Sequence, residues 1–209
     1  MHRLTLSSIA LATCLLGCAV APARAEPLQG EPWSYAASAS FYLIEGASDY
    51  AQPTITADRG HLHLEARFNY EDLDTGSAWV GYNLAVGEKL VLEITPMLGV
   101  VFGETRGIAP GYKGTLSGWG LDLYSEVEYV IDADDSDDSF LYTWTELTVA
   151  PVDGWRAGLV IQRTKAYETE FEIQRGLLVG YSFERLEMTA YAFNPDDSST
   201  WVLAVGGSF

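Results

Sequence analysis

Two histidines separated by one residue come closest to a metal-ligand pair in this sequence. Within residues 60–70, GHLHLEARFNY, His61 and His63 would share one face of a strand, because alternate side chains point the same way. Two imidazoles so placed could chelate a metal ion, but the spacing fixes no third ligand. We therefore predict two histidines at a rim, near an external loop, and no metal site. As general bases they would need a nucleophile such as Ser38 or Ser40, which nothing in the sequence marks as activated.

The acidic run at residues 132–138, DADDSDD, raises the question of calcium binding. It lacks the central glycine and the terminal glutamate of an EF-hand loop. We interpret it as a solvated loop, and a weak divalent-cation site is the alternative.

The elements that carry these residues alternate with period two, which is typical of strands with one apolar face. In residues 60–70 the apolar face is Leu62, Leu64, Ala66, Phe68 and Tyr70. Residues 119–131 alternate in the same way. Between the alternating segments lie turn-like stretches such as 72–76, 87–89, 106–111, 151–154 and 194–197.

An export signal precedes these segments. Residues 4–20 are apolar, Arg3 comes before them, and Ala23-Arg24-Ala25 offers a cleavage site, so we predict a signal peptide at 1–25 and a mature chain at 26–209. Cys14 and Cys18 would leave with the signal, which excludes disulfides and thiolate metal sites from the mature chain. Cleavage would also remove two basic residues and no acid, leaving 10 bases, 29 acids and a net charge of −19. So acidic a chain is unsuited to nucleic acid.

The alternation predicts ten strands, and eight is the alternative count. The predicted strands cover 34–44, 59–70, 77–86, 89–102, 115–131, 139–150, 155–166, 170–183, 186–194 and 200–209. Folding the chain about residue 169 would place Trp155 opposite Phe183 and Arg163 opposite Arg175, with an apolar ladder between them.

The last strand, WVLAVGGSF, places Trp201, Leu203, Val205 and the terminal Phe209 on one face. With the export signal and the amphipathic strands, this ending resembles the assembly signal of Gram-negative outer-membrane β-barrels. The resemblance implies an all-β, antiparallel transmembrane β-barrel in the bacterial outer membrane. It also implies insertion by the barrel-assembly machinery, and it concerns the superfamily, not a named family. A soluble periplasmic β-sandwich that binds a ligand is the alternative fold, since a sandwich also alternates polar and apolar faces.

In such a barrel the polar face would line the lumen. The predicted lumen residues are His63, Glu65, Arg67, Glu93, Asp122, Glu126, Glu128, Glu146 and Arg156. Two interpretations stay open: a core filled by paired ions, because narrow barrels are packed with side chains, and a narrow acidic path that favours cations.

Three cations fall on the lipid-facing side near a predicted external loop: Arg163, Lys165 and Arg175. A cation is costly at the bilayer midplane but not at the interface. We therefore interpret them as contacts to lipopolysaccharide phosphates, or as side chains that snorkel to the interface.

The function predicted from the sequence is a small structural or porin-like barrel without a cofactor, with outer-membrane lipid and lipopolysaccharide as its partners. The alternative activity is a lipid or peptide hydrolase that acts at the external rim. The residues specify neither a solute nor an oligomeric state.

Overall fold

A computed structural model describes residues 31–163, 173–195 and 199–209, so the predicted signal peptide with Cys14 and Cys18 lies outside the described residues. Over the described residues the chain forms a single antiparallel sheet. Its strands are β1 (Ser34–Ile44), β2 (Tyr50–Arg59), β3 (Leu62–Phe68), β4 (Thr75–Tyr82), β5 (Leu84–Gly87), β6 (Leu90–Gly103), β7 (Gly107–Gly118), β8 (Leu121–Asp132), β9 (Phe140–Val152), β10 (Trp155–Arg163), β11 (Gln174–Phe183), β12 (Leu186–Phe193) and β13 (Thr200–Ser208). A short 3₁₀ helix covers Ser136–Asp138. None of the described helices is long and apolar enough to cross a membrane.

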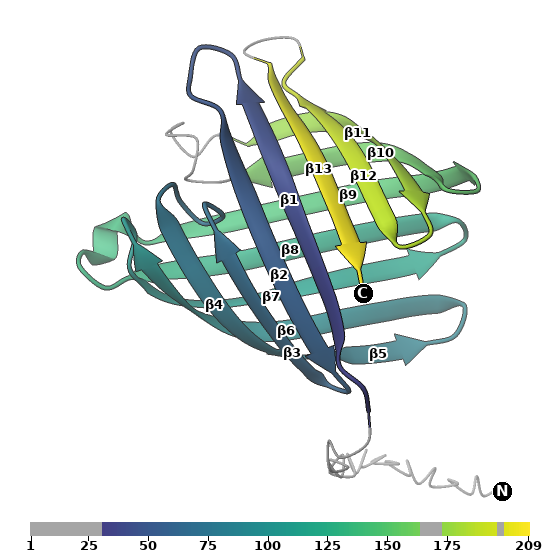
Figure 1. Ribbon diagram of the computed structural model, residues 1–209, viewed down its shortest axis with the longest axis horizontal. Helices are drawn as coiled ribbons and strands as arrows, with labels where there is room; N and C mark the ends of the chain where they lie inside the picture. The colour runs from purple at the N-terminus through teal and green to yellow at the C-terminus, as the bar shows by residue number, and fades with distance from the viewer. Residues whose placement is uncertain (1–30, 164–172, 196–198) are drawn as a thin grey trace, which may run out of the picture.

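The sheet closes on itself. β1 pairs with β13, and β4 pairs with β6, so no gap is left in the wall (Figure 1). β4 and β5 both pair with β6 in one continuous register, from Gly81 opposite Met97 to Leu84 opposite Ile94. They therefore form one strand interrupted near Asn83, and the barrel has 12 strands. The predicted antiparallel barrel is confirmed, and the β-sandwich is excluded by the closed single sheet.

The predicted count of ten strands, and the alternative of eight, are wrong because two strands were missed. β2, to which no strand was assigned, contains Pro53, and its pairing with β3 begins only at Thr54, so the missing N–H is not needed on that side. β7 begins at Gly107, within a stretch expected to be a turn. The turn lies instead at Trp119 and Gly120, which both have positive φ, as tight hairpin turns require.

The two ends of the barrel differ. Short turns at residues 60–61, 88–89, 119–120, 153–154 and 184–185 lie at the end where β1 begins and β13 ends, here called the turn end. Longer connections, including 45–49, 69–74 and 133–139, lie at the opposite loop end. In bacterial outer-membrane barrels short turns are periplasmic, so the turn end of this barrel corresponds to their periplasmic end.

The outer surface is apolar and the interior is polar. Leu121 and Leu159 are 44% and 56% exposed on the outside, whereas Glu126 is 2% exposed inside. This is the reverse of a water-soluble protein, and it suits a barrel surrounded by hydrocarbon.

The β10–β11 hairpin keeps the predicted faces but not the predicted register. Trp155 lies opposite Tyr181, not Phe183, and Arg175 lies opposite Ile161, not Arg163. The shift is two residues, and an even shift leaves every side chain on the same face. The apolar ladder therefore still points outward.

Candidate functional site

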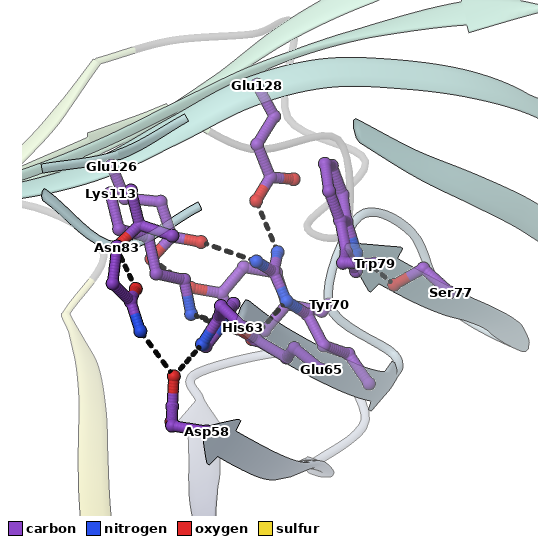
Figure 2. A network of polar contacts seen from close by, with 12 residues as sticks. Asp58, His63, Glu65, Tyr70, Ser77, Trp79, Asn83, Lys113, Glu126 and Glu128 are labelled. Carbon is purple, nitrogen blue, oxygen red and sulfur yellow. Dashed lines mark hydrogen bonds and ion pairs between the residues drawn. The ribbon is translucent and has the colours of Figure 1, made fainter. Parts of the chain in front are cut away.

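Arg67 is the centre of a charged cluster inside the barrel. Alternation along β3 points His63, Glu65 and Arg67 into the lumen, where all three are buried (Figure 2). The Arg67 guanidinium contacts Glu65 at 2.5 Å on its own strand, and Glu126 at 3.1 Å and Glu128 on β8. These contacts join strands that are not neighbours in the wall, so the cluster spans part of the lumen.

Lys113 completes this cluster from β7. Its Nζ lies 2.7 and 2.6 Å from the two carboxylate oxygens of Glu65, and His63 Nε2 lies 3.0 Å from Oε2. The other ring nitrogen of His63 lies 2.8 Å from Asp58 Oδ1. Lys113 was not predicted as a lumen residue. Residues 106–111 were interpreted as a turn, and no strand was assigned between residues 102 and 115.

The β3–β4 loop, residues 69–74, turns into the barrel. The Tyr70 hydroxyl donates a hydrogen bond to Glu126 Oε2 at 3.0 Å. The ring centroids of Tyr70 and of Tyr142 on β9 lie 5.2 Å apart. Burial raises the pKa of the Tyr70 phenol well above its usual value, so the phenol remains a donor at neutral pH. Glu71 is fully buried and accepts hydrogen bonds from Ser77 at 2.6 Å and Trp79 at 3.3 Å.

The position of Tyr70 differs from the prediction, which placed it on the outward apolar face. Asn69 has a φ of 56°, and this left-handed residue ends the alternation of β3. Its side chain donates to the Ala51 carbonyl at 3.1 Å and accepts from the Asp74 N–H at 2.8 Å. The loop is thereby held in place at its base.

A second charged cluster lies around Glu146 on β9. One carboxylate oxygen accepts from Trp144 at 2.9 Å and from Tyr191 at 2.8 Å, and the other accepts from Arg156 at 2.6 Å. Arg156 extends across Gly180, where a Cβ atom would lie 2.8 Å from its Nε. Glycine at this position therefore leaves room for the guanidinium.

Aromatic and apolar side chains fill the lumen toward the loop end. Tyr42 stacks on Tyr50 with ring centroids 4.6 Å apart, and Trp144 meets Phe193 edge-on at 5.6 Å. Val101, Val130 and Phe140 are buried in the same cluster. The loop end of the lumen is thus restricted by side chains as well as by the β3–β4 loop.

A cavity of about 200 Å³ lies among these groups. Its lining residues are Ser38, Ser40, Tyr42, Gln52, Thr54, Glu65, Tyr70, Lys113, Tyr124, Glu126, Tyr142, Trp144, Glu146 and Tyr191. A second cavity of about 300 Å³ at the turn end shares Ser38 and Thr54 with the first. The interior is therefore reached from the turn end.

Two predicted lumen residues lie apart from the charged clusters. Glu93 is exposed opposite Ala85 on β5, beyond the end of β3. Asp122 is half-buried near the turn end of β8. Alternation in the sequence predicts whether a side chain points into or out of the barrel. It does not predict the position of that side chain along the barrel axis, and this position decides which residues are in contact.

The two histidines do not converge. His61 lies at the β2–β3 turn, at the turn end and not near an external loop as predicted, and its ring stacks on Tyr82. His63 is held between two carboxylates. Within the described residues, neither histidine is hydrogen-bonded to a hydroxyl group, and no group of three or more His, Cys, Asp or Glu side chains is arranged to hold a metal ion.

The remaining predicted sites lie on the outside. Arg163 ends β10, and Arg175 lies near the start of β11, so the two residues flank the β10–β11 connection at the loop end. Arg163 donates a hydrogen bond to the Leu141 carbonyl at 2.8 Å. Lys165 lies outside the described residues. Trp201, Leu203, Val205 and Phe209 are exposed on or just beyond β13. In the acidic loop, Asp134 pairs with Arg106 at 2.8 Å.

Solved structures of other β-barrels share this architecture. No family model and no curated protein matches the chain. Among solved structures, a KdgM porin matches with a TM-score of 0.56 and 11% identity, and a KdgM porin in complex with disordered oligogalacturonate with 0.59 and 10%. Each match covers 83% of this chain and 99% of the other. The outer membrane protein Omp33 of Acinetobacter baumannii matches with a TM-score of 0.45 and 8% identity over 86% of this chain and 97% of the other. The two KdgM matches concern the fold alone, and they confirm the closed antiparallel β-barrel.

Proposed function

We propose that this chain is a narrow porin of the outer membrane, in which the β3–β4 loop restricts passage and the lining favours cations over anions. The observation that carries the proposal is a closed barrel whose polar interior holds a cavity reached from the turn end. The inward loop bearing Tyr70 and Glu71 supports a restricted pore instead of an open one.

The charges of the lumen support the selectivity. Of the charged side chains that line the cavity, three are carboxylates, Glu65, Glu126 and Glu146, and one is a cation, Lys113. A ring of acids favours cations in a pore. A polyanion such as the oligogalacturonate bound to the KdgM porin would meet excess negative charge here.

Conductance across a planar lipid bilayer tests this proposal. We expect a small unitary conductance and a reversal potential, under a KCl gradient, that indicates cation selectivity. Tyr70→Ala combined with Tyr142→Ala should increase the conductance, because both rings lie at the restriction. Glu126→Gln should reduce the selectivity, whereas Asp137→Asn in the exposed loop is the matched control.

A filled structural barrel is the second candidate, and the fully buried charges of the Arg67 cluster favour it. It predicts no conductance in the wild type or in the Tyr70/Tyr142 double variant. Heat-modifiable migration on SDS gels would show that both proteins are folded.

The proposed partners are lipopolysaccharide and the barrel-assembly machinery. Arg163 and Arg175 lie on the lipid-facing side at the loop end, where guanidinium groups meet phosphates. The exposed row Trp201, Leu203 and Val205, followed by Phe209, is the proposed assembly signal. Deleting Phe209 should slow insertion by purified assembly machinery, and Asp153→Asn at an exposed turn is the control.

A further inference from the structure

The carboxylates on the charged wall of the cavity have partners within the protein. Both oxygens of Glu65 are contacted by Lys113. Glu126 accepts from Tyr70 and Tyr124 on one oxygen and pairs with Arg67 on the other. Glu146 is likewise bonded on both oxygens. The three carboxylates that line the cavity are therefore each paired with groups of the protein, although buried atoms of the neighbouring charged residues, among them Arg67 Nη2 and Glu128 Oε2, make no hydrogen bond.

The opposite wall is a patch of four neutral polar residues on β1 and β2. Ser38 lies opposite Thr54, and Ser40 lies opposite Gln52, so the four residues are adjacent on one inward-facing surface. Gln52 is only 4% exposed, yet among the described residues its amide and the three hydroxyls have no side-chain hydrogen-bond partner. The polar atoms of the Gln52 amide are not fully enclosed, so they reach the cavity, where water or a solute supplies the hydrogen bonds.

Exposure along this patch increases toward the turn end. Gln52 is buried, Ser40 and Thr54 are half-buried, and Ser38 is exposed to the second cavity. The patch therefore leads from the open end of the barrel to the restriction.

The chemistry of the patch indicates the class of ligand. A hydroxyl or a carboxamide both donates and accepts hydrogen bonds, which suits a ligand whose own groups do both. Ligand hydroxyl groups meet that condition, whereas an ammonium group only donates and a carboxylate only accepts. Across the cavity, Tyr142, Trp144 and Tyr191 offer apolar surface to the carbon skeleton.

The size of the cavity limits the ligand to a single small unit. At about 30 Å³ for each water molecule, the cavity of about 200 Å³ corresponds to about seven waters. That space suits one sugar ring or one short polyol, but not a chain of sugars.

We propose that the patch formed by Ser38, Ser40, Gln52 and Thr54 binds one uncharged polyhydroxy solute, such as a monosaccharide, in the lumen. This inference rests on the proposed porin function, because it names the class of solute that the pore admits. The solute enters from the turn end, bonds to the β1–β2 patch and lies against the aromatic side chains of β9 and β12. The charged clusters hold the cavity open without bonding to the solute.

Binding to the purified full-length mature protein in detergent tests the inference. The probes are D-glucose, choline and D-galacturonate, and the signal is the tryptophan fluorescence, to which Trp144 in the cavity contributes. We expect saturable binding of glucose and weaker binding of the two charged probes. Gln52→Leu combined with Ser40→Ala should weaken glucose binding about tenfold, the effect of losing one or two hydrogen bonds.

Ser117→Ala is the matched control, because Ser117 is a half-buried hydroxyl on β7 that does not line either cavity. If the double variant does not fold, as judged by heat-modifiable migration, Ser40→Ala with Thr54→Val replaces it.

The outcomes separate the two proposals. Conductance without saturable glucose binding would overturn the solute class and leave the porin function standing. Glucose binding without conductance in any variant would overturn the porin function and retain the site. Glucose binding that the double variant does not weaken, or tighter binding of choline than of glucose, would overturn the inference.

Discussion

The two walls of the lumen differ in how completely their polar groups are bonded. On the wall around Arg67, ions, phenols and an indole contact one another across non-neighbouring strands. On the β1–β2 wall, four neutral groups have no such partners within the described residues. The cross-strand ion pairs give the charged wall a structural role, and the neutral wall is the surface that we propose for the solute.

The largest expected effect is on the charged wall. Arg67→Met should destabilise the folded barrel by about 3–5 kcal/mol, because it leaves buried carboxylates without their counter-ion. The measurement is guanidinium-induced unfolding in lipid vesicles, followed by tryptophan fluorescence. Arg156→Met is the comparison, and its effect should be smaller, because the Arg156 side chain is 26% exposed. Equal losses in the two variants would contradict the special role of Arg67.

A smaller effect is expected where the charged wall is packed most tightly. Gly99 lies beneath the Trp79 ring, and a Cβ atom there would lie 2.5 Å from the ring. Gly99→Ala should therefore cost about 1–3 kcal/mol of unfolding free energy. Gly114→Ala is the control, because the nearest atom to its Cβ would be 3.3 Å away. A tolerated Gly99→Ala would show that Trp79 is not fixed in this position.

The two phenols on Glu126 should each contribute less. Tyr70 and Tyr124 donate to the same carboxylate oxygen at 3.0 and 2.7 Å. Tyr70→Phe or Tyr124→Phe should reduce stability by about 1–2 kcal/mol. The double variant should lose more than the sum, because Glu126 then keeps no phenolic donor. Strict additivity in the same unfolding measurement would argue that the two bonds are independent.

The smallest effect belongs to the neutral wall. Gln52→Leu removes a buried amide that has no described partner, so stability should stay unchanged or rise by up to about 1 kcal/mol. Ser40→Ala should change it by less than about 0.5 kcal/mol. A substantial loss in either variant would mean that the neutral wall also supports the fold.

Much of the inward face could be predicted from the alternation alone. Along β3 and β8 the period of two places Glu65, Arg67, Glu126 and Glu128 inside, as the structure does. The outer apolar face follows from the same period. An even register shift, such as that in the β10–β11 hairpin, leaves this information unchanged.

The centre of the site could not be predicted in the same way. Tyr70 and Glu71 enter the lumen because Asn69 adopts a left-handed conformation that the alternation does not encode. Lys113 meets Glu65 only because β7 and β3 are brought together through β6 and β4. Proline and glycine in β2 and β7 concealed those strands, and with them the neutral patch on β2. Contacts between distant strands depend on the order of the strands in the sheet and on the position of each residue along the barrel axis. A local sequence pattern predicts neither.

The interruption at Asn83 leaves the barrel with an uneven rim. Asn83 bonds to Asp58 and Thr95 through its side chain and to His61 through its backbone, so the end of the β2–β3 hairpin is tied to the wall at this point. Beyond it, β5 continues along β6, and within the described part of the chain no strand pairs with its other edge. An open edge invites strand addition by another chain, but β5 is only four residues long and stops at Gly87. The rim at the turn end thus exposes a β-edge too short to support intermolecular sheet growth.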